Sequence, residues 1–449
     1  MHVRCARPRR AVFTAVVGAA ALAASVIAPG ATVTAAATGS GAMQPAIGVH
    51  PHFVPAGSVI HTAQGAMFHC QTTTPAECYG PAQIKAAYGV DKLAAQGLDG
   101  LGRTIVIVDA YSSPTITQDL AAFDSLFGLP DAHLQVIAPQ GMTAFNANDP
   151  TQVGWSGEIT LDVEWAHAIA PDAAIRLVLA RSSNDADILA ATNYAVAHNL
   201  GDVISQSFGE AEQCMNQGLL AAQHRLFARA TAMGITLLAS AGDSGAAQPT
   251  CDGSSYFQAA STPASDPNVT GVGGTRLVAN GITGAYQSES VWNDQFGAGG
   301  GGFSVVYATP RYQRSLGLTS RGVPDVSYNA AVIGGVLTVW TDPGLGQGVF
   351  LFGGTSAGTP QWAGIVALAD QLHHGRVGEI NAQLYAAARH ESSYATDFHD
   401  VTVGNNGALP ITAGFDAAPG WDAASGLGTP QADQLVPMLA QRALVGSSR

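Results

Sequence analysis

The sequence has few charged residues, and lysine is almost absent from it. Only 11% of the 449 residues are charged, whereas an ordinary soluble domain has about 25%. The only lysines are Lys85 and Lys92, while 47% of the residues are hydrophobic. This composition excludes a disordered protein and a protein that coats nucleic acid, because both classes need abundant charge. The formal net charge of −13 also argues against any polyanionic partner.

Long hydrophobic runs are missing except near the N-terminus. There, four arginines precede an apolar run over Ala11–Ala28, and small residues follow up to Ala37. This pattern predicts a secretory signal peptide over residues 1–37. The alternative is a signal anchor that stays in the membrane, but the run is mostly alanine and valine and barely long enough to span. We therefore expect a secreted, extracellular protein with no stable membrane association after signal cleavage.

Cysteine is scarce, and its distribution agrees with export. Cys5 lies in the predicted signal peptide, which leaves Cys70, Cys78, Cys214 and Cys251 as an even set. Four cysteines allow three pairings. We favour Cys70 with Cys78, which closes a short polar loop, and Cys214 with Cys251, which joins two loops flanking one helix–strand unit. Metal ligation is the weaker alternative, since no CxxC spacing or histidine partner accompanies these residues.

The chain divides into three parts by composition. After the signal, residues 38–80 are rich in Gly, Pro, His and Thr without periodicity, which predicts an extended arm. Residues 81–445 form the predicted main domain, in which short apolar runs alternate with helical patterns. The expected strands cover 104–108, 174–179, 202–206 and 235–240, and the expected helices cover 117–127, 185–197 and 218–233. This alternation predicts one large α/β domain with a doubly wound, mostly parallel sheet and helices on both faces.

Two aspartates, Asp109 and Asp243, directly follow apolar strands of this predicted sheet. Functional residues of such sheets usually lie in loops at the carboxyl ends of the strands. Both residues are therefore candidates by position. The structural alternative is that each aspartate only caps the next turn or helix.

The strongest local motif is GTSAGTP at 354–360, which is followed by an apolar helical pattern. Small residues around Ser356 allow a substrate backbone to come close, and a helix N-terminus places positive partial charge behind the serine oxygen. This suits a nucleophile, although a serine before a helix is also an ordinary N-cap. The motif is close to the subtilisin pattern GTSMAxP, but the histidine motif HGTH that should accompany it is absent.

A pair of carboxyl residues offers another base for Ser356. Glu158 and Asp162 are four positions apart, so both carboxylates lie on one face of a helix. The residues around them are largely apolar, which predicts a buried helix. Two like charges in a buried helix are unfavourable unless they share a proton or serve a function.

These motifs together resemble the sedolisins, the serine-carboxyl peptidases with a subtilisin-like fold and a Ser, Glu, Asp set. The ExxxD pair matches Glu158 and Asp162, GTSAxxP matches Ser356, and SAGDSG at 240–245 matches the loop of the oxyanion aspartate. Further matches lie at 257–275, 300–313 and 321–326. The resemblance covers roughly residues 81–437, and several motifs in one order are far more specific than any single one.

The resemblance implies a role for each catalytic candidate. Ser356 would attack the scissile carbonyl, with Glu158 as general base and then acid, and Asp162 would orient Glu158. Asp243 would donate a hydrogen bond to the oxyanion, which requires a protonated carboxyl and hence acidic conditions. Asp109 would extend the carboxyl network in a supporting role. The implied function is an endopeptidase acting on proteins in acid. A tripeptidyl-type exopeptidase of the same mechanism and a non-catalytic secreted binding protein are the alternatives.

The resemblance also implies one structural calcium ion. Two segments, 399–406 and 418–430, are similar to the calcium loop of the family. The implied ligands are the side chains of Asp400 and Asp422 and the main-chain carbonyls of Val401, Ala418 and Gly420. Calcium prefers such hard oxygen donors.

One feature departs from the family pattern. Sedolisins are commonly made with a long folded prodomain, whereas only residues 38–80 lie between the predicted signal and the main domain. We therefore expect no such prodomain. The expected partners are protein or peptide substrates, with no nucleic acid, and the expected state is a monomer.

Overall fold

The centre of the computed structural model is an eight-stranded sheet. The structure describes residues 52–57, 59–62, 65–408 and 410–446, so the predicted signal peptide lies outside the described residues. Six of the strand pairs are parallel, and only the edge strand β15 runs antiparallel to its neighbour. In order across the sheet the strands are β15 (Tyr286–Val291), β14 (Thr270–Ala279), β10 (Thr236–Ser240), β8 (Val203–Gln206), β5 (Thr104–Ala110), β7 (Ala174–Ala180) and β6 (His133–Ile137), and β18 (Val326–Asn329) pairs with β14.

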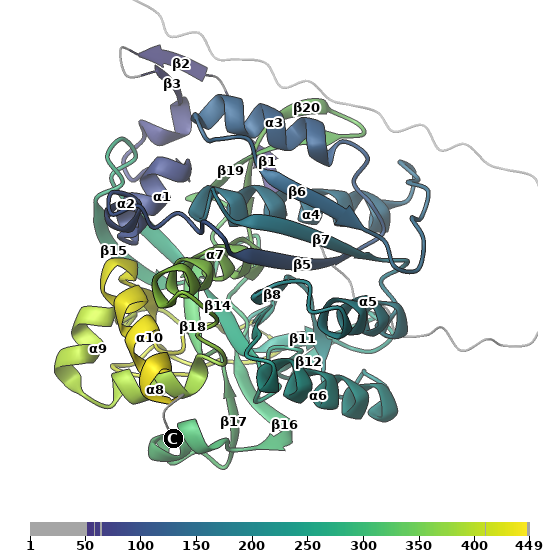
Figure 1. Ribbon diagram of the computed structural model, residues 1–449, viewed down its shortest axis with the longest axis vertical. Coiled ribbons are helices and arrows are strands. Elements are labelled where there is room, and N and C mark those ends of the chain that lie inside the picture. Colours follow the sequence, from purple (N-terminus) through teal and green to yellow (C-terminus); the bar gives the residue numbers. More distant parts are fainter. Residues whose placement is uncertain (1–51, 58, 63–64, 409, 447–449) are drawn as a thin grey trace, which may run out of the picture. The chain divides into compact units, whose positions relative to one another are not determined.

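Helices cover both faces of this sheet (Figure 1). On one face, α5 (Asp185–Ala197) packs on β5 and β7, and α6 (Gln217–Ala232) packs on β10. On the other face lie α4 (Pro150–Ile169) and α7 (Thr355–His373), which also contact each other. Apolar side chains fill the two interfaces as separate hydrophobic clusters. The predicted fold class, a mostly parallel α/β sheet covered on both faces, is confirmed.

The strand predicted over 104–108 is longer than expected. β5 continues through Asp109, which lies opposite Leu179 of β7, and ends at Ala110. The prediction that Asp109 follows the strand in a loop is therefore wrong. The pairing with β7 extends the strand, although a buried aspartate would normally end an apolar run.

A second, four-stranded sheet joins the N-terminal segment to the domain. Its order is β1 (His52–Pro55), β20 (Gly346–Gly353), β19 (Gly335–Asp342) and β4 (Cys78–Tyr79). In the antiparallel pair of β1 and β20, His52 lies opposite Gly353. This pairing places His52 beside the start of the GTS motif, because its partner Gly353 directly precedes Gly354.

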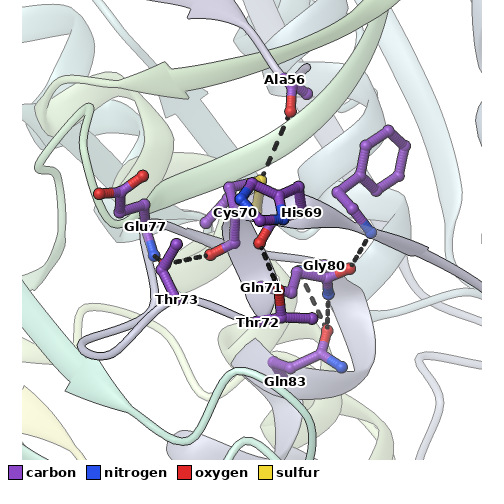
Figure 2. Close-up of a disulfide and its surroundings, with 11 residues drawn as sticks. Ala56, His69, Cys70, Gln71, Thr72, Thr73, Glu77, Gly80 and Gln83 are labelled. Atoms are coloured by element: carbon purple, nitrogen blue, oxygen red, sulfur yellow. Dashed lines mark hydrogen bonds between the residues drawn. A yellow bond between two sulfur atoms is a disulfide. The ribbon is translucent and has the colours of Figure 1, made fainter. Parts of the chain in front are cut away.

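The favoured disulfide pairing is confirmed. Cys70 is bonded to Cys78, and Cys214 is bonded to Cys251. Figure 2 shows how the first loop is closed: the Thr73 hydroxyl donates to the Cys70 carbonyl at 2.8 Å, and the Glu77 amide donates to the Thr73 hydroxyl at 3.1 Å. The loop is thus fixed by local hydrogen bonds as well as by the disulfide.

The remaining helices and strands complete the described part of the chain. The helices among them are α1 (Pro81–Ala87), α2 (Val90–Ala94), α3 (Ile116–Phe127), α8 (Asn381–Ala388), α9 (Glu391–Asp397) and α10 (Ala432–Gly446), with 3₁₀ turns at His69–Gln71 and Arg311–Leu316. The strands are β2 (Val59–Thr62), β3 (Gly65–Phe68), β9 (Glu210–Ala211), β11 (Ala247–Pro249), β12 (Tyr256–Gln258), β13 (Ser261–Thr262), β16 (Gly302–Ala308), β17 (Ser320–Val323), β21 (Phe398–His399) and β22 (Thr429–Pro430). Within the described ranges, no helix has both the length and the apolar character needed to cross a membrane.

The contact between α4 and α7 is close because of one glycine. A Cβ atom at Gly364 of α7 would lie 2.6 Å from Cγ2 and 2.7 Å from Cβ of Ile169, at the end of α4. Real carbon atoms do not approach this closely, so glycine allows the two helix backbones to come together. The same two helices carry Glu158, Asp162 and Ser356, so this contact controls their relative position.

Gly364→Ala tests this packing. Helix propensity alone would stabilise the variant by about 1 kcal/mol, whereas overpacking against Ile169 costs about 1–3 kcal/mol. We expect a net loss of stability in urea unfolding. Gly375→Ala is the control, because the nearest atom to its new Cβ is 3.7 Å away. A stabilised Gly364→Ala variant would contradict the close contact.

Candidate active site

Ser356 lies in the first turn of α7, at the edge of a cavity of about 330 Å³. Its side chain is mostly buried, with 8% exposed, and its hydroxyl donates to the main-chain oxygen of Ser207 at 3.4 Å. The helix begins after Gly354, whose φ of +107° is a conformation that glycine adopts readily. The local sequence thus places a small hydroxyl at a helix N-terminus that opens on a cavity.

Glu158 lines the same cavity from the middle of α4. Asp149 caps this helix by accepting a hydrogen bond from the Thr151 amide at 3.0 Å, and Pro150 occupies the first helical position. Glu158 and Asp162 follow two and three turns later and are both buried, with 1% and 0% exposed. The predicted buried helix with two carboxyl groups on one face is therefore present in the structure.

The surroundings of Glu158 and Asp162 favour the protonated forms. Burial raises the pKa of Glu158 well above its usual value; the nearby Ser356 hydroxyl lowers it, and Asp109 and Asp243 raise it again. Burial also raises the pKa of Asp162, with further increases from Asp109 and Glu158. None of the four oxygens of Glu158 and Asp162 has a hydrogen bond of normal geometry to a described residue. A buried carboxyl without donors is far less costly when neutral.

Asp109 belongs to the same group of carboxyls, although it lies on β5. It is fully buried, and burial raises its pKa to about 8. Its charge contributes to the raised pKa of both Glu158 and Asp162. Three carboxyl groups from a strand and a helix therefore form one buried cluster behind Ser356.

Asp243 reaches the cavity from the loop after β10 and is held by the start of α7. Its Oδ1 accepts hydrogen bonds from the Thr355 amide at 2.7 Å and from the Thr355 hydroxyl at 2.8 Å. A Cβ atom at Gly354 would lie 2.5 Å from Oδ2, so only glycine leaves room for this carboxyl. With Oδ1 accepting two hydrogen bonds, Oδ2 is the oxygen left to contact a ligand in the cavity.

Three residues at the cavity were not expected from the sequence. Thr355 orients Asp243, as described above. Ser207 follows β8 and contacts Ser356 through its carbonyl oxygen, and its side chain lowers the pKa of Asp162. Ser207 directly follows a parallel strand, and functional residues of such sheets usually lie there, so its position pointed to a role in the site. His52 also lines the cavity, but no local pattern could reveal this, because it depends on the pairing of β1 with β20.

Several known proteins are similar to this chain. The model of the Subtilase family matches residues 141–405. Kumamolisin of Bacillus sp. (strain MN-32) is 33% identical over 408 residues, covering 87% of this chain and 68% of that protein. The chain belongs to the sedolisin family. The structure of a Pseudomonas sedolisin, titled a serine-carboxyl proteinase complexed with two molecules of pseudo-iodotyrostatin, superposes with a TM-score of 0.71 at 30% identity, covering 82% of this chain and 99% of that one.

The family and the subtilisin-like fold predicted from the motifs are thus confirmed, and the family consists of serine-carboxyl peptidases, which are hydrolases. Sedolisin of Pseudomonas sp. (strain 101) is 34% identical over 345 residues. The match covers 73% of this chain and only 56% of that protein. The chain therefore spans little more than half the length of this relative.

The two loops implied as a calcium site lie together in the structure. The Gly420 amide donates to Asp400 Oδ2 at 3.1 Å, and the Ala418 amide donates to Asp422 Oδ2 at 3.0 Å. Both carboxylates therefore face the 418–422 loop. Neither is paired with a lysine or arginine in the described part of the chain.

Val401, whose main-chain carbonyl is another implied ligand, lies close to the Asp422 carboxyl. The Ser425 hydroxyl contacts both the Val401 carbonyl at 3.4 Å and the Asp422 carboxyl at 3.1 Å. No group of three or more His, Cys, Asp or Glu side chains within the described ranges is placed to hold a metal ion. The implied set has only two carboxylates and takes its other oxygens from the main chain, which is a donor type that fits calcium.

The buried carboxyl cluster predicts how stability depends on pH. The pKa of Asp109 is about 8 in the folded chain against 3.8 as an ordinary value. A raised pKa means that the folded state binds the proton more tightly, so this contribution to stability is present below about pH 4 and is lost as the pH rises toward 8. Asp109→Asn should unfold with a weaker pH dependence over this range, as measured by urea midpoints.

Asp131→Asn provides the control for this measurement, because Asp131 is exposed. Its pH dependence should equal that of the parent chain. If Asp109→Asn also shows the full pH dependence of the parent chain, the proton on the buried cluster is not what links stability to pH.

Proposed function

We propose that this chain is a secreted serine-carboxyl endopeptidase that hydrolyses peptide bonds of proteins in acid. One observation carries the proposal: Ser356, Glu158 and Asp243 line a single cavity, and Asp162 and Asp109 form the buried carboxyl cluster behind Glu158. These are the groups that a serine-carboxyl peptidase needs for nucleophile, base and oxyanion donor.

The reaction follows from these positions. Ser356 Oγ attacks the scissile carbonyl carbon while its proton passes to Glu158, and the carbonyl oxygen becomes an oxyanion. Glu158 must be the ionised member of the cluster at this step, with the cluster's protons held by Asp162 and Asp109. Asp243 donates the hydrogen bond that stabilises this oxyanion. Glu158 then protonates the leaving amine, which leaves an acyl-enzyme ester on Ser356. A water molecule hydrolyses this ester by the same steps and restores Ser356.

The neighbouring acids would support the proton transfers. Asp109 raises the pKa of both Glu158 and Asp162, and Glu158 raises that of Asp162 as well, so protons can be shared among the three carboxyl groups. In this proposal Asp162 orients Glu158, and Asp109 is a positioning residue. Acid conditions are expected because a carboxyl group can donate to an oxyanion only while it is protonated.

Ser356→Ala is the direct test of the nucleophile. Digestion of casein or haemoglobin in acid should fall by about 10³-fold or more, because removal of a nucleophile leaves only binding and oxyanion stabilisation. Ser392→Ala is the control, since Ser392 is exposed on α9. Equal activity of parent chain and Ser356→Ala would sink the proposal and would favour the alternative of a non-catalytic binding protein.

A tripeptidyl exopeptidase is the second candidate. Tripeptidyl-peptidase sed5 of Aspergillus fumigatus is 33% identical over 236 residues, covering 45% of this chain and 38% of that protein. An exopeptidase needs a free amino terminus, whereas an endopeptidase does not. Cleavage of a peptide with a blocked N-terminus therefore separates the two candidates.

We also propose that one structural calcium ion binds at Asp400 and Asp422, with the carbonyls of Val401, Ala418 and Gly420. Two carboxylates that face the same loop, and the Val401 carbonyl that shares Ser425 Oγ with Asp422, support this. The ion would join the 400–401 and 418–422 loops and would stabilise the folded state by mass action. The ion would take no part in the chemistry at Ser356.

Thermal unfolding with and without calcium tests the site. At calcium a thousand times above its Kd, we expect the Tm to rise by about 5 °C relative to the chelated chain. Asp422→Asn should lose this increase. Asp416→Asn should keep it, because the Asp416 side chain is bonded to Asn405 and lies outside the implied ligands. A Tm that does not respond to calcium would contradict the proposal.

Secretion and the boundaries of the chain's parts belong to the same proposal. A signal peptide over residues 1–37, an arm over 38–80 and a peptidase domain over 81–445 fit an exported peptidase with two disulfides. The proposed partners are protein and peptide substrates, and the proposed state is a monomer.

A further inference from the structure

A second cavity, of about 410 Å³, adjoins the catalytic cavity. The two share His52, Asp243, Ser244 and Tyr256 in their walls. We propose that this second cavity is a substrate subsite that takes a lysine or arginine side chain of the peptide, with the Asp294 carboxylate as its partner. The proposal rests on the proposed function, because it concerns the same substrate.

The second cavity has a fixed position relative to the oxyanion aspartate. The Ala298 amide donates to the Asp243 carbonyl at 3.0 Å, and the Gly245 amide donates to the Ala298 carbonyl at 2.9 Å. Next to it, a Cβ atom at Gly297 would lie 2.7 Å from the Asp243 carbonyl oxygen. The wall over 293–298 therefore packs directly on the loop that carries Asp243. A peptide whose scissile carbonyl lies at Asp243 can thus extend into this cavity.

Asp294 has an oxygen available for a ligand. Its Oδ1 accepts a hydrogen bond from the Phe296 amide at 2.8 Å, which fixes the side chain in a turn. No donor from the described residues occupies its Oδ2, and the residue is only half-buried. A fixed carboxylate with one free oxygen at a cavity wall is suited to a charge-assisted hydrogen bond.

The opposite rim is held in place by an amide. Asn293 Nδ2 donates to the Asn405 carbonyl at 2.8 Å and to the Gly407 carbonyl at 3.0 Å. These bonds join the two sides of the second cavity, which Gly407, Ala408 and Ile411 complete. The cavity is therefore bounded by structured backbone on both sides, with small and apolar residues that leave space for an alkyl stem.

The ionisable side chains that line the two cavities are mostly acidic. Among the described residues they are the carboxyl groups of Glu158, Asp243 and Asp294 and one histidine, His52, with no lysine or arginine. Of these carboxyls, Glu158 and Asp243 belong to the catalytic group, so Asp294 is the one left to bind a side chain. With no lysine or arginine among the described lining residues to pair with it, the Asp294 carboxylate favours a cationic substrate group and disfavours an acidic one.

Peptides that are blocked at both ends and differ only at one position test the subsite. Lys, Gln or Glu is placed in turn at each of the residues near the scissile bond, and kcat/KM is measured. We expect the parent chain to prefer Lys over Gln by about tenfold at one position. In Asp294→Asn this ratio should fall to about one, and in Asp294→Lys the preference should change to Glu.

The control is Asp342→Asn. Asp342 is also half-buried and also accepts amide hydrogen bonds in a turn, from Gly344 and Leu345, but it lines neither cavity. This variant should keep the tenfold ratio. The subsite proposal is overturned if Asp294→Asn keeps the ratio as well, or if the parent chain shows no Lys preference at any position.

A binding measurement separates failure of the subsite from failure of the proposed function. In the Ser356→Ala background, the Lys peptide should bind about tenfold more tightly than the Gln peptide, and Asp294→Asn should remove the difference. If the parent chain cleaves no peptide but this difference is found, the peptidase function fails and the cavity remains a cation-binding site. If the peptides are cleaved and no difference is found, only the subsite fails.

Discussion

The packing of α4 against α7 is the contact on which the rest of the site depends. It removes Glu158 and Asp162 from water and brings Ser356, at the start of α7, to the cavity that Glu158 lines. Burial then raises the pKa of both carboxyl groups, and Asp109 on β5 raises it further. The same packing that stabilises the fold therefore places the proposed base, Glu158, at the cavity that Ser356 lines, without a histidine. This packing also buries an acidic cluster, which destabilises the fold least while its carboxyl groups are protonated.

The loop that carries Asp243 connects this chemistry to substrate binding. On one side, Asp243 accepts two hydrogen bonds from Thr355 and lies over Gly354, so its position depends on the start of α7. On the other side, its backbone is bonded to Ala298, which belongs to the wall of the second cavity. The proposed oxyanion donor and the proposed subsite around Asp294 are therefore joined by hydrogen bonds, so that a substrate bound by its side chain would also be placed for attack.

The sequence predicted those parts of the fold that depend on local patterns. Alternating apolar strands and helices predicted the parallel sheet, and the four-residue spacing of Glu158 and Asp162 predicted a buried helix with two carboxyls. Asp109 was placed wrongly because strand length depends on pairing with β7 and not on the apolar run alone. His52 was missed entirely, since its place at the cavity comes from the pairing of β1 with β20, about 300 residues away in the chain. Contacts over such separations leave no local signal.

The central claim is that a carboxyl group, Glu158, takes the proton from Ser356 within a buried acidic cluster. The most direct test is the pH dependence of kcat/KM on a neutral blocked peptide for the parent chain and for Glu158→Gln, which keeps the shape of the side chain but cannot accept a proton. The account predicts hydrolysis confined to acid for the parent chain and its loss at every pH for the variant. An optimum at neutral pH, or a variant that retains the activity of the parent chain, would contradict it.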